Sequence, residues 1–264
     1  IYTGEDTLSL HDALPISGIG FAIATELARE GVAVVLNGRS NERVAQAVQR
    51  LQAAVPQAQV RGVAADVASA AGCDLLAQAS AGVDILVNNF GIFDPQPFEA
   101  IDDAQWQRFF DANVMSGVRL TRALLPAMQA AGWGRVVFIN SESGVNPPTE
   151  MVHYGMSKAA QLSVSRGLAQ HCAGTGVTVN AVLPGPTRTE GVGDFFAKLA
   201  AEQGVDLAEA EQRFFTNARP TSLLRRFIEP SEVAALVAYV CSPRSAATNG
   251  AALRVEGGIL SSIC

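Results

Sequence analysis

Short apolar runs alternate with segments of helical periodicity along most of the chain. From Gly18 onward the runs are rich in valine and isoleucine and apolar at nearly every position, as in strands buried on both faces of a sheet. The predicted strands are 32–37, 60–64, 85–88, 136–140, 177–182 and 251–255. The predicted helices include 21–29, 42–54, 104–131, 155–173 and 231–241, the last with Ser231 as its N-cap. This alternation predicts one α/β domain with a Rossmann-like, doubly wound parallel sheet.

Two segments interrupt the alternation. Gly18-Ile19-Gly20 opens a helix, but no apolar strand precedes it, although such folds place a strand near the sheet centre there. We therefore expect the natural first strand to be missing from this chain. Residues 187–222 form a long excursion that carries Phe195, Phe196, Phe214 and Phe215, which predicts a helical lid over a site.

The first sixteen residues match nothing that a dinucleotide fold would place there. Residues 8–16 are the translation of the sequencing adapter CTTTCCCTACACGACGCTCTTCCGATC, and Ile1-Tyr2-Thr3 is the translation of its upstream part, ATC-TAC-AC. A variable index of the adapter accounts for the residues between these two parts. We interpret residues 1–16 as an adapter artefact fused in frame to the gene, and residues 17–264 as the α/β domain.

Composition limits the function classes. Apolar residues make up 48% of the chain and the net charge is −6, without a block of basic residues, so we expect no nucleic-acid partner. No run reaches the about 18 apolar residues that a membrane span needs. The four cysteines, Cys73, Cys172, Cys241 and Cys264, lack metal or disulfide spacing, which favours free thiols in a reducing cytoplasm and no metal site.

Residues suited to a dinucleotide follow the predicted strands. At the start of a helix, the backbone N–H groups of Gly18-Ile19-Gly20 can hold a pyrophosphate. Arg39, with Ser40, follows the next strand where a carboxylate would select NAD, and this favours NADP(H) over NAD(H). The remaining candidates lie at later strand ends: Asp66-Val67, facing the adenine, and the turn Asn88-Asn89-Phe90-Gly91.

The catalytic candidates are Ser141, Tyr154 and Lys158. Tyr154 and Lys158 are one helical turn apart and share a face. A lysine ammonium beside the phenol lowers its pKa from about 10, so that Tyr154 can exchange a proton with a substrate oxygen near neutral pH. Ser141, at the end of a strand, can hydrogen-bond the same oxygen.

Together these motifs resemble the short-chain dehydrogenase/reductase family, and within it bacterial 3-oxoacyl-acyl-carrier-protein reductase-like oxidoreductases. The resemblance covers Ser17 to the C-terminus and rests on the following matches: Gly18-Ile19-Gly20, Asn88-Asn89-Phe90-Gly91, Asn113, Ser141, Tyr154-Gly155-Met156-Ser157-Lys158 and Asn180-Ala181-Val182-Leu183-Pro184-Gly185.

This resemblance implies a seven-stranded sheet and a catalytic tetrad of Asn113, Ser141, Tyr154 and Lys158. Asn113 would hold a water that links Lys158 to a proton relay, and Lys158 would also bind the nicotinamide ribose. The cofactor-binding residues it implies are Ser17, Gly18, Ile19, Gly20, Arg39, Ser40, Asp66, Val67, Asn88, Asn89, Gly91, Tyr154, Lys158, Pro184, Gly185, Thr187 and Thr189. It further implies a cytoplasmic homo-oligomer, a tetramer or a dimer.

The substrate pocket is predicted from residues near the tetrad. The candidates are Glu142, Ser143, Asn146, Met151, His153 and the lid phenylalanines. An acid at Glu142 favours a polar or hydroxylated substrate. The preferred function is hydride transfer between NADP(H) and a small carbonyl or alcohol substrate. Two alternatives stay open: an NAD-dependent polyol or hydroxyacid dehydrogenase, and a catalytically silent dinucleotide-binding protein.

Overall fold

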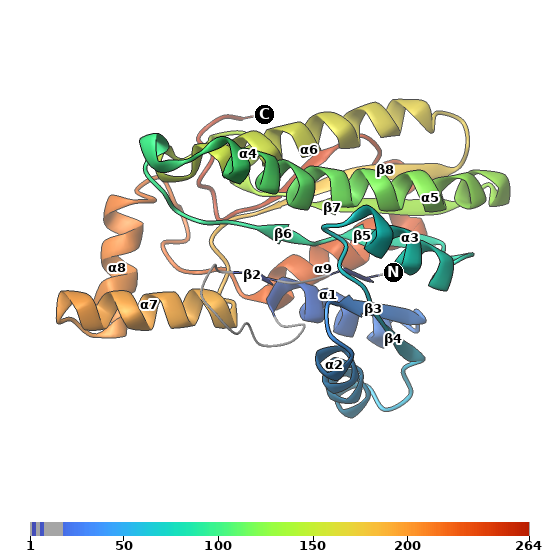
Figure 1. Ribbon diagram of the computed structural model, residues 1–264, viewed down its shortest axis with the longest axis horizontal. Coiled ribbons are helices and arrows are strands. Elements are labelled where there is room, and N and C mark those ends of the chain that lie inside the picture. Colours follow the sequence, from blue (N-terminus) through green and yellow to red (C-terminus); the bar gives the residue numbers. More distant parts are fainter. Residues whose placement is uncertain (1, 4–5, 8–17, 264) are drawn as a thin grey trace.

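A parallel sheet with helices on both faces forms the body of the molecule (Figure 1). The computed structural model describes residues 2–3, 6–7 and 18–263. Within that part of the chain the sheet has seven strands in the order β4-β3-β1-β5-β7-β8-β9, and all neighbours are parallel. The order reverses at the central strand, as in doubly wound folds. The predicted fold class is confirmed.

The elements follow the predicted alternation. The strands are β1 (Tyr2–Thr3), β2 (Asp6–Thr7), β3 (Val34–Gly38), β4 (Val60–Ala64), β5 (Ile85–Asn88), β6 (Gly91–Ile92), β7 (Gly134–Ile139), β8 (Val177–Pro184) and β9 (Ala252–Val255). The helices are α1 (Gly18–Arg29), α2 (Asn41–Ala54), α3 (Ala70–Ala79), α4 (Asp103–Phe110), α5 (Ser116–Ala131), α6 (Val152–His171), α7 (Glu190–Gln203), α8 (Leu207–Asn217) and α9 (Pro230–Cys241). Short helical turns are η1 (Phe98–Ala100), η2 (Asp111–Met115), η3 (Glu142–Gly144), η4 (Thr149–Met151) and η5 (Pro243–Ser245).

Two apolar layers hold the helices on the sheet. One layer packs α1, α2 and α9 against one face, with Ile23, Leu36 and Val237 fully buried. The other packs α3, α4, α5 and α6 against the opposite face, around Phe109 and Phe138. Burial on both faces explains why the strands are apolar at consecutive positions.

The start of α9 differs from the sequence prediction. Ser231 was expected to cap the helix, but the N-cap is Glu229, and Pro230 is the first helical residue. The Glu232 carboxylate accepts a hydrogen bond from the Glu229 N–H at 2.8 Å. This arrangement is favoured because proline lacks an N–H group, and the first helical position does not need one.

A two-residue strand, β1, lies between β3 and β5, where we expected the natural first strand to be missing. Its residues pair with Leu36 and Asn37 of β3 and with Val87 and Asn88 of β5. The facing backbone groups of the two neighbouring strands can pair with any extended segment, which explains a strand here without an apolar run.

Beside this short strand is a cavity of about 710 Å³, whose apolar lining includes Val34, Val35, Ile85 and Trp133. We propose that residues 1–16 are foreign to the natural protein, as the adapter match indicates. Replacing them with a five- to six-residue apolar strand and a glycine turn is expected to raise the free energy of unfolding by about 2 kcal/mol for each large apolar side chain buried. Urea unfolding measures the change, with a serine- and glycine-rich strand as the control. Equal stability of the original and the apolar-strand chains would contradict the proposal.

The excursion at residues 187–222 contains α7 and α8, which lie together beyond the ends of the strands (Figure 1). Phe196, Phe214, Phe215 and Phe227 pack there as a separate small core. The side chain of Phe195 lies outside the described part of the structure. Among the described residues, no helix is both long and apolar enough to cross a membrane.

Candidate active site

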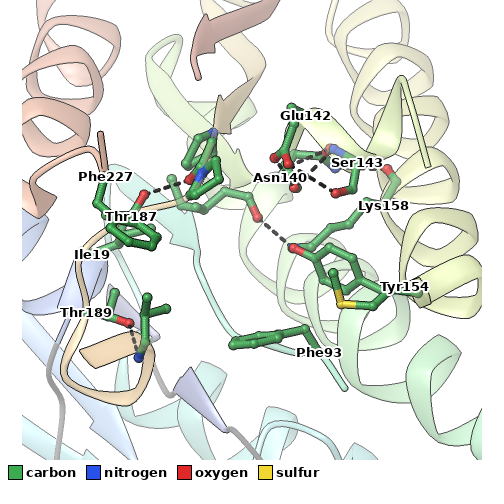
Figure 2. Close-up of a pocket in the computed structure, with 18 of the residues that line it drawn as sticks. Ile19, Phe93, Asn140, Glu142, Ser143, Tyr154, Lys158, Thr187, Thr189 and Phe227 are labelled. Carbon is green, nitrogen blue, oxygen red and sulfur yellow. Dashed lines mark hydrogen bonds between the residues drawn. The ribbon is translucent and has the colours of Figure 1, made fainter. Parts of the chain in front are cut away.

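Tyr154 and Lys158 project from one face of α6 into a pocket at the carboxyl ends of the strands (Figure 2). The Lys158 Nζ atom lies 5.6 Å from the centroid of the Tyr154 ring. Lys158 is buried, and its ammonium group donates a hydrogen bond to the Ile139 carbonyl at 3.0 Å. The Tyr154 ring packs edge-on against Phe93, with 6.4 Å between centroids. The phenol is therefore held at the pocket surface with a fixed positive charge beside it.

Ser141 follows β7 and lines the same pocket as Tyr154. Its hydroxyl donates a hydrogen bond to Glu142 Oε2 at 2.6 Å and accepts one from the Ser143 N–H at 3.1 Å. The Ser141 N–H in turn donates to Asn140 Oδ1 at 2.9 Å. These contacts fix the serine at the strand end.

Asn113 lies in a π-helical turn, η2, between α4 and α5. Such turns bulge out of an α-helix and are frequent at functional sites. The side-chain Oδ1 of Asn113 accepts a hydrogen bond from the Ile92 N–H at 2.7 Å. Its Nδ2 donates to the Ile92 carbonyl at 2.9 Å and to Ser157 Oγ at 2.8 Å. The Gly91 backbone lies close to the Lys158 side chain, because a Cβ atom added at Gly91 would be 3.4 Å from Lys158 Nζ.

Two amide side chains that the sequence analysis did not single out connect these residues. Gln161 Nε2 donates to the Asn113 carbonyl at 3.0 Å, and Asn140 Nδ2 donates to Gln161 Oε1 at 2.8 Å and to the Lys158 carbonyl at 2.9 Å. This buried bridge joins the end of β7 to α6 and to the π-helical turn. The water link between Asn113 and Lys158 stays a prediction.

The pocket has a volume of about 380 Å³ and is largely apolar. Glu142, Ser143 and Met151 line it, where the sequence analysis placed them. Its apolar wall includes Ile92, Phe93, Pro95, Val192, Phe196, Phe214 and Phe227, two of which, Phe196 and Phe214, are phenylalanines of the lid region. Asn146 is not part of the lining.

His153 was predicted to form a wall of the pocket, and the structure places it elsewhere. It is fully buried between Trp106 and Phe109, with ring centroids 6.0 and 3.9 Å away. Successive positions on a helix point about 100° apart, so a residue next to Tyr154 faces the neighbouring helix α4 instead. Burial lowers the pKa of His153, and the charge of Asp94 opposes that shift, so the surroundings favour the neutral ring.

Glu142 is the buried acid of the pocket. Arg219, which follows α8, approaches it with 3.9 Å between Nε and Oε1 and binds Glu150 at 3.1 Å. Burial raises the pKa of Glu142, while the Ser141 hydroxyl and the Arg219 charge oppose that rise. Sequence reasoning missed Arg219, although a buried acid calls for a cationic partner.

Several cofactor candidates line one part of this same pocket, which we call the crevice. Gly18 starts α1 with a backbone φ angle of +68°, which residues other than glycine rarely adopt. Ile19 and Asn89 line the crevice. Thr187 and Thr189 lie on the same side of the pocket as Ile19 (Figure 2), on the segment that also carries Pro184 and Gly185. Ser17 lies outside the described residues.

Several candidates have structural partners at the strand ends. Ser40 caps α2, accepting a hydrogen bond from the Arg43 N–H. The exposed Asp66 carboxylate accepts a hydrogen bond from the Ala68 N–H. Val67 is buried in the core. The Asn88 side-chain amide donates a hydrogen bond to Thr121 Oγ1 at 3.3 Å. These contacts hold the crevice in shape.

The residues present fit a phosphorylated dinucleotide. The start of α1 offers N–H donors, Lys158 contributes an ammonium group, and Arg39 is exposed just beyond the carboxyl end of β3, at the same edge of the sheet. These are the donors that a pyrophosphate and a ribose phosphate require. Within the described ranges no cluster of His, Cys, Asp and Glu has the arrangement of a metal site.

Comparison with known proteins identifies relatives over nearly the whole chain. The sequence model of the short chain dehydrogenase family matches residues 16–200. The uncharacterized oxidoreductase YvaG of Bacillus subtilis is 48% identical over 247 residues, which cover 94% of each chain. L-Sorbose reductase from Gluconobacter frateurii, solved with NADPH and L-sorbose, has a TM-score of 0.89 at 31% identity and covers 99% of this chain and 96% of its own. A candidate betaketoacyl-ACP reductase has a TM-score of 0.78 at 35% identity, covering 94% and 95% of the two chains.

Proposed function

This chain belongs to the short-chain dehydrogenase/reductase family, and on that premise we propose that it transfers hydride between NADP(H) and a carbonyl or alcohol substrate, with Tyr154 as the acid/base. The oxidoreductase class follows from the family. The observation that carries the finer proposal is the arrangement of Ser141, Tyr154 and Lys158 around one apolar pocket at the cofactor crevice.

Each residue has a distinct role in this proposal. NADPH, when bound, supplies the hydride. Tyr154 gives a proton to the substrate oxygen in reduction and takes it back in oxidation. Ser141 donates a hydrogen bond to the same oxygen. Lys158 stabilises the phenolate by its charge and binds the nicotinamide ribose. Asn113 holds the water that links Lys158 to a proton relay.

The remaining cofactor residues of the proposal bind the dinucleotide without taking part in the proton transfer. The start of α1 holds the pyrophosphate, and Thr187 and Thr189 flank the nicotinamide together with Pro184 and Gly185. Asp66 and Val67 lie toward the adenine. Displacement of bulk water by the phenylalanines of the lid would strengthen the electrostatic contacts inside.

Arg39 is proposed to select NADP(H) by binding the ribose phosphate. The relation to L-sorbose reductase, whose structure contains NADPH, supports this preference. Arg39→Gln is expected to weaken NADPH binding by about 10- to 100-fold, because a charge-assisted hydrogen bond is lost, and to leave NADH binding unchanged. Fluorescence titration with both dinucleotides measures this, with exposed Arg244→Gln as the matched control. Equal effects on the two cofactors would count against a phosphate-binding role.

The proposal extends to location and assembly. Cys73, Cys172 and Cys241 are free and buried, which agrees with a reducing cytoplasm. A shallow groove on the paired helices α5 and α6, lined by Val118, Leu125 and Leu168, offers an apolar face for a homo-tetramer or dimer. Light scattering on the purified protein determines the number of subunits.

A panel of ketones and aldehydes tests the proposed function. The protein is incubated with NADPH or NADH, and the loss of the reduced-nicotinamide absorbance is followed for each substrate. Reduction with a preference for NADPH is the expected result. Turnover only of polyols with NAD⁺, followed as a gain in the same absorbance, would favour the NAD-dependent dehydrogenase, and cofactor binding without any turnover would favour a silent dinucleotide-binding protein.

A further inference from the structure

The hydroxyl of Ser141 is already engaged by its neighbour in sequence. Ser141 Oγ donates to Glu142 Oε2 at 2.6 Å, and this hydroxyl has only one hydrogen to give. The same oxygen accepts from the Ser143 N–H at 3.1 Å, which fixes its orientation. A ketone that enters the pocket therefore meets a serine whose hydrogen points to Glu142 rather than to the substrate oxygen.

The Glu142 carboxyl group is built into the substrate side of the pocket. Its residue is 6% exposed, and it lies on the pocket wall above Lys158 and Tyr154 in Figure 2. Arg219 balances the charge from the lid side, 3.9 Å away. In either protonation state the carboxyl has an oxygen that accepts a hydrogen bond, so a donor on the substrate can bind there.

Resting on the proposed function, we propose that Glu142 is a specificity-determining residue that accepts a hydrogen bond from a hydroxyl on the carbon next to the reacting carbonyl. The substrate hydroxyl then replaces Ser141 as a donor to Glu142, and the Ser141 hydrogen becomes available to the carbonyl oxygen. A substrate without this hydroxyl leaves Ser141 bound to Glu142 and its carbonyl less polarised.

The apolar part of the pocket lining defines the rest of the substrate. Phe93, Met151, Phe196, Phe214 and Phe227 line it, and none of these side chains offers a hydrogen-bond donor to a substrate. The preferred substrate class is accordingly an α-hydroxy ketone with an apolar substituent on the other side of the carbonyl, or the matching vicinal diol in the oxidative direction.

Phenacyl alcohol and propiophenone test the proposal, because they differ only by a hydroxyl in place of a methyl group. The ratio of kcat/KM for phenacyl alcohol to that for propiophenone is measured in the wild type and in Glu142→Leu. Comparing the ratios cancels the different intrinsic reactivity of the two ketones. We expect the ratio to fall by about 10- to 100-fold in the variant, as for one lost hydrogen bond to a charged group.

Two further variants keep the test decisive. Glu142→Gln retains an accepting oxygen and nearly the same shape, so it is expected to keep part of the preference even if Glu142→Leu fails to fold. Glu99→Gln, an exposed acid, is the matched control and should keep the wild-type ratio. Calorimetry with styrene glycol and ethyl phenyl carbinol, in the presence of NADPH, which cannot accept a hydride from an alcohol, should show the same change in relative affinity without any turnover.

The outcomes separate the inference from the function on which it rests. Reduction of both ketones with an unchanged ratio in both Glu142 variants overturns the role of Glu142 but leaves the oxidoreductase in place. Reduction of other ketones but of neither probe by the wild type overturns the substrate class. No reduction of any ketone by the wild type overturns the proposed function itself.

Discussion

Tyr154→Phe is expected to lower kcat by about 10³-fold while NADPH affinity stays within about twofold of the wild type. The variant loses only the phenolic oxygen, which would give the proton to the substrate. Its ring can keep the edge-on contact with Phe93 and the position on α6, so the pocket retains its shape. Steady-state kinetics with NADPH and a ketone measure kcat, and fluorescence titration measures cofactor binding.

The matched control for this variant is Tyr239→Phe, because Tyr239 is exposed on α9 and is not part of the pocket. It should keep wild-type activity. If Tyr154→Phe turned over a ketone as fast as the wild type, Tyr154 would not be the proton donor.

Lys158→Met is expected to reduce kcat by about 10²-fold or more and to weaken cofactor binding. Without the ammonium group, nothing at this position stabilises the phenolate of Tyr154. In the oxidative direction, where Tyr154 must accept a proton, the pH of half-maximal rate should therefore rise by about one unit or more. The pH profile of alcohol oxidation measures this shift.

A structural effect of Lys158→Met can be separated from the catalytic one. The variant removes a buried charge and its hydrogen bond to Ile139, so methionine of similar length should keep the stability close to that of the wild type. Lys198→Met, at the exposed second lysine of the chain, serves as the control. An unshifted pH profile in Lys158→Met would assign the lysine to packing alone.

The sheet could be predicted because its signal is local. Most strands are short runs rich in valine and isoleucine, and 60–64 and 85–88 were placed with the bounds that the structure has, although β4 is partly exposed. The single predicted helix 104–131 is three elements, since the π-helical turn at Asn113 depends on contacts with Ile92 and Ser157. Those contacts are not visible in the local pattern.

The candidate site was predictable where its residues share an element or a strand end. Tyr154 and Lys158 are one helical turn apart, and Ser141 ends a buried strand, so their meeting follows from the fold. Arg219 was not predictable, because its contact with Glu142 depends on how the α7–α8 segment folds back over the pocket. His153 was misplaced because adjacency to Tyr154 in sequence was taken as adjacency in the pocket.

Transfer of deuterium from the cofactor to a ketone tests the central claim most directly. The protein is incubated with phenacyl alcohol, a small panel of other ketones, and NADPH deuterated at the transferable position of the nicotinamide. The products are then analysed by mass spectrometry. The account predicts an alcohol that carries one deuterium on the former carbonyl carbon, formed about 10³-fold more slowly with Tyr154→Phe. Bound NADPH without a deuterated alcohol from any ketone would contradict it and would make the chain a dinucleotide-binding protein without hydride-transfer activity.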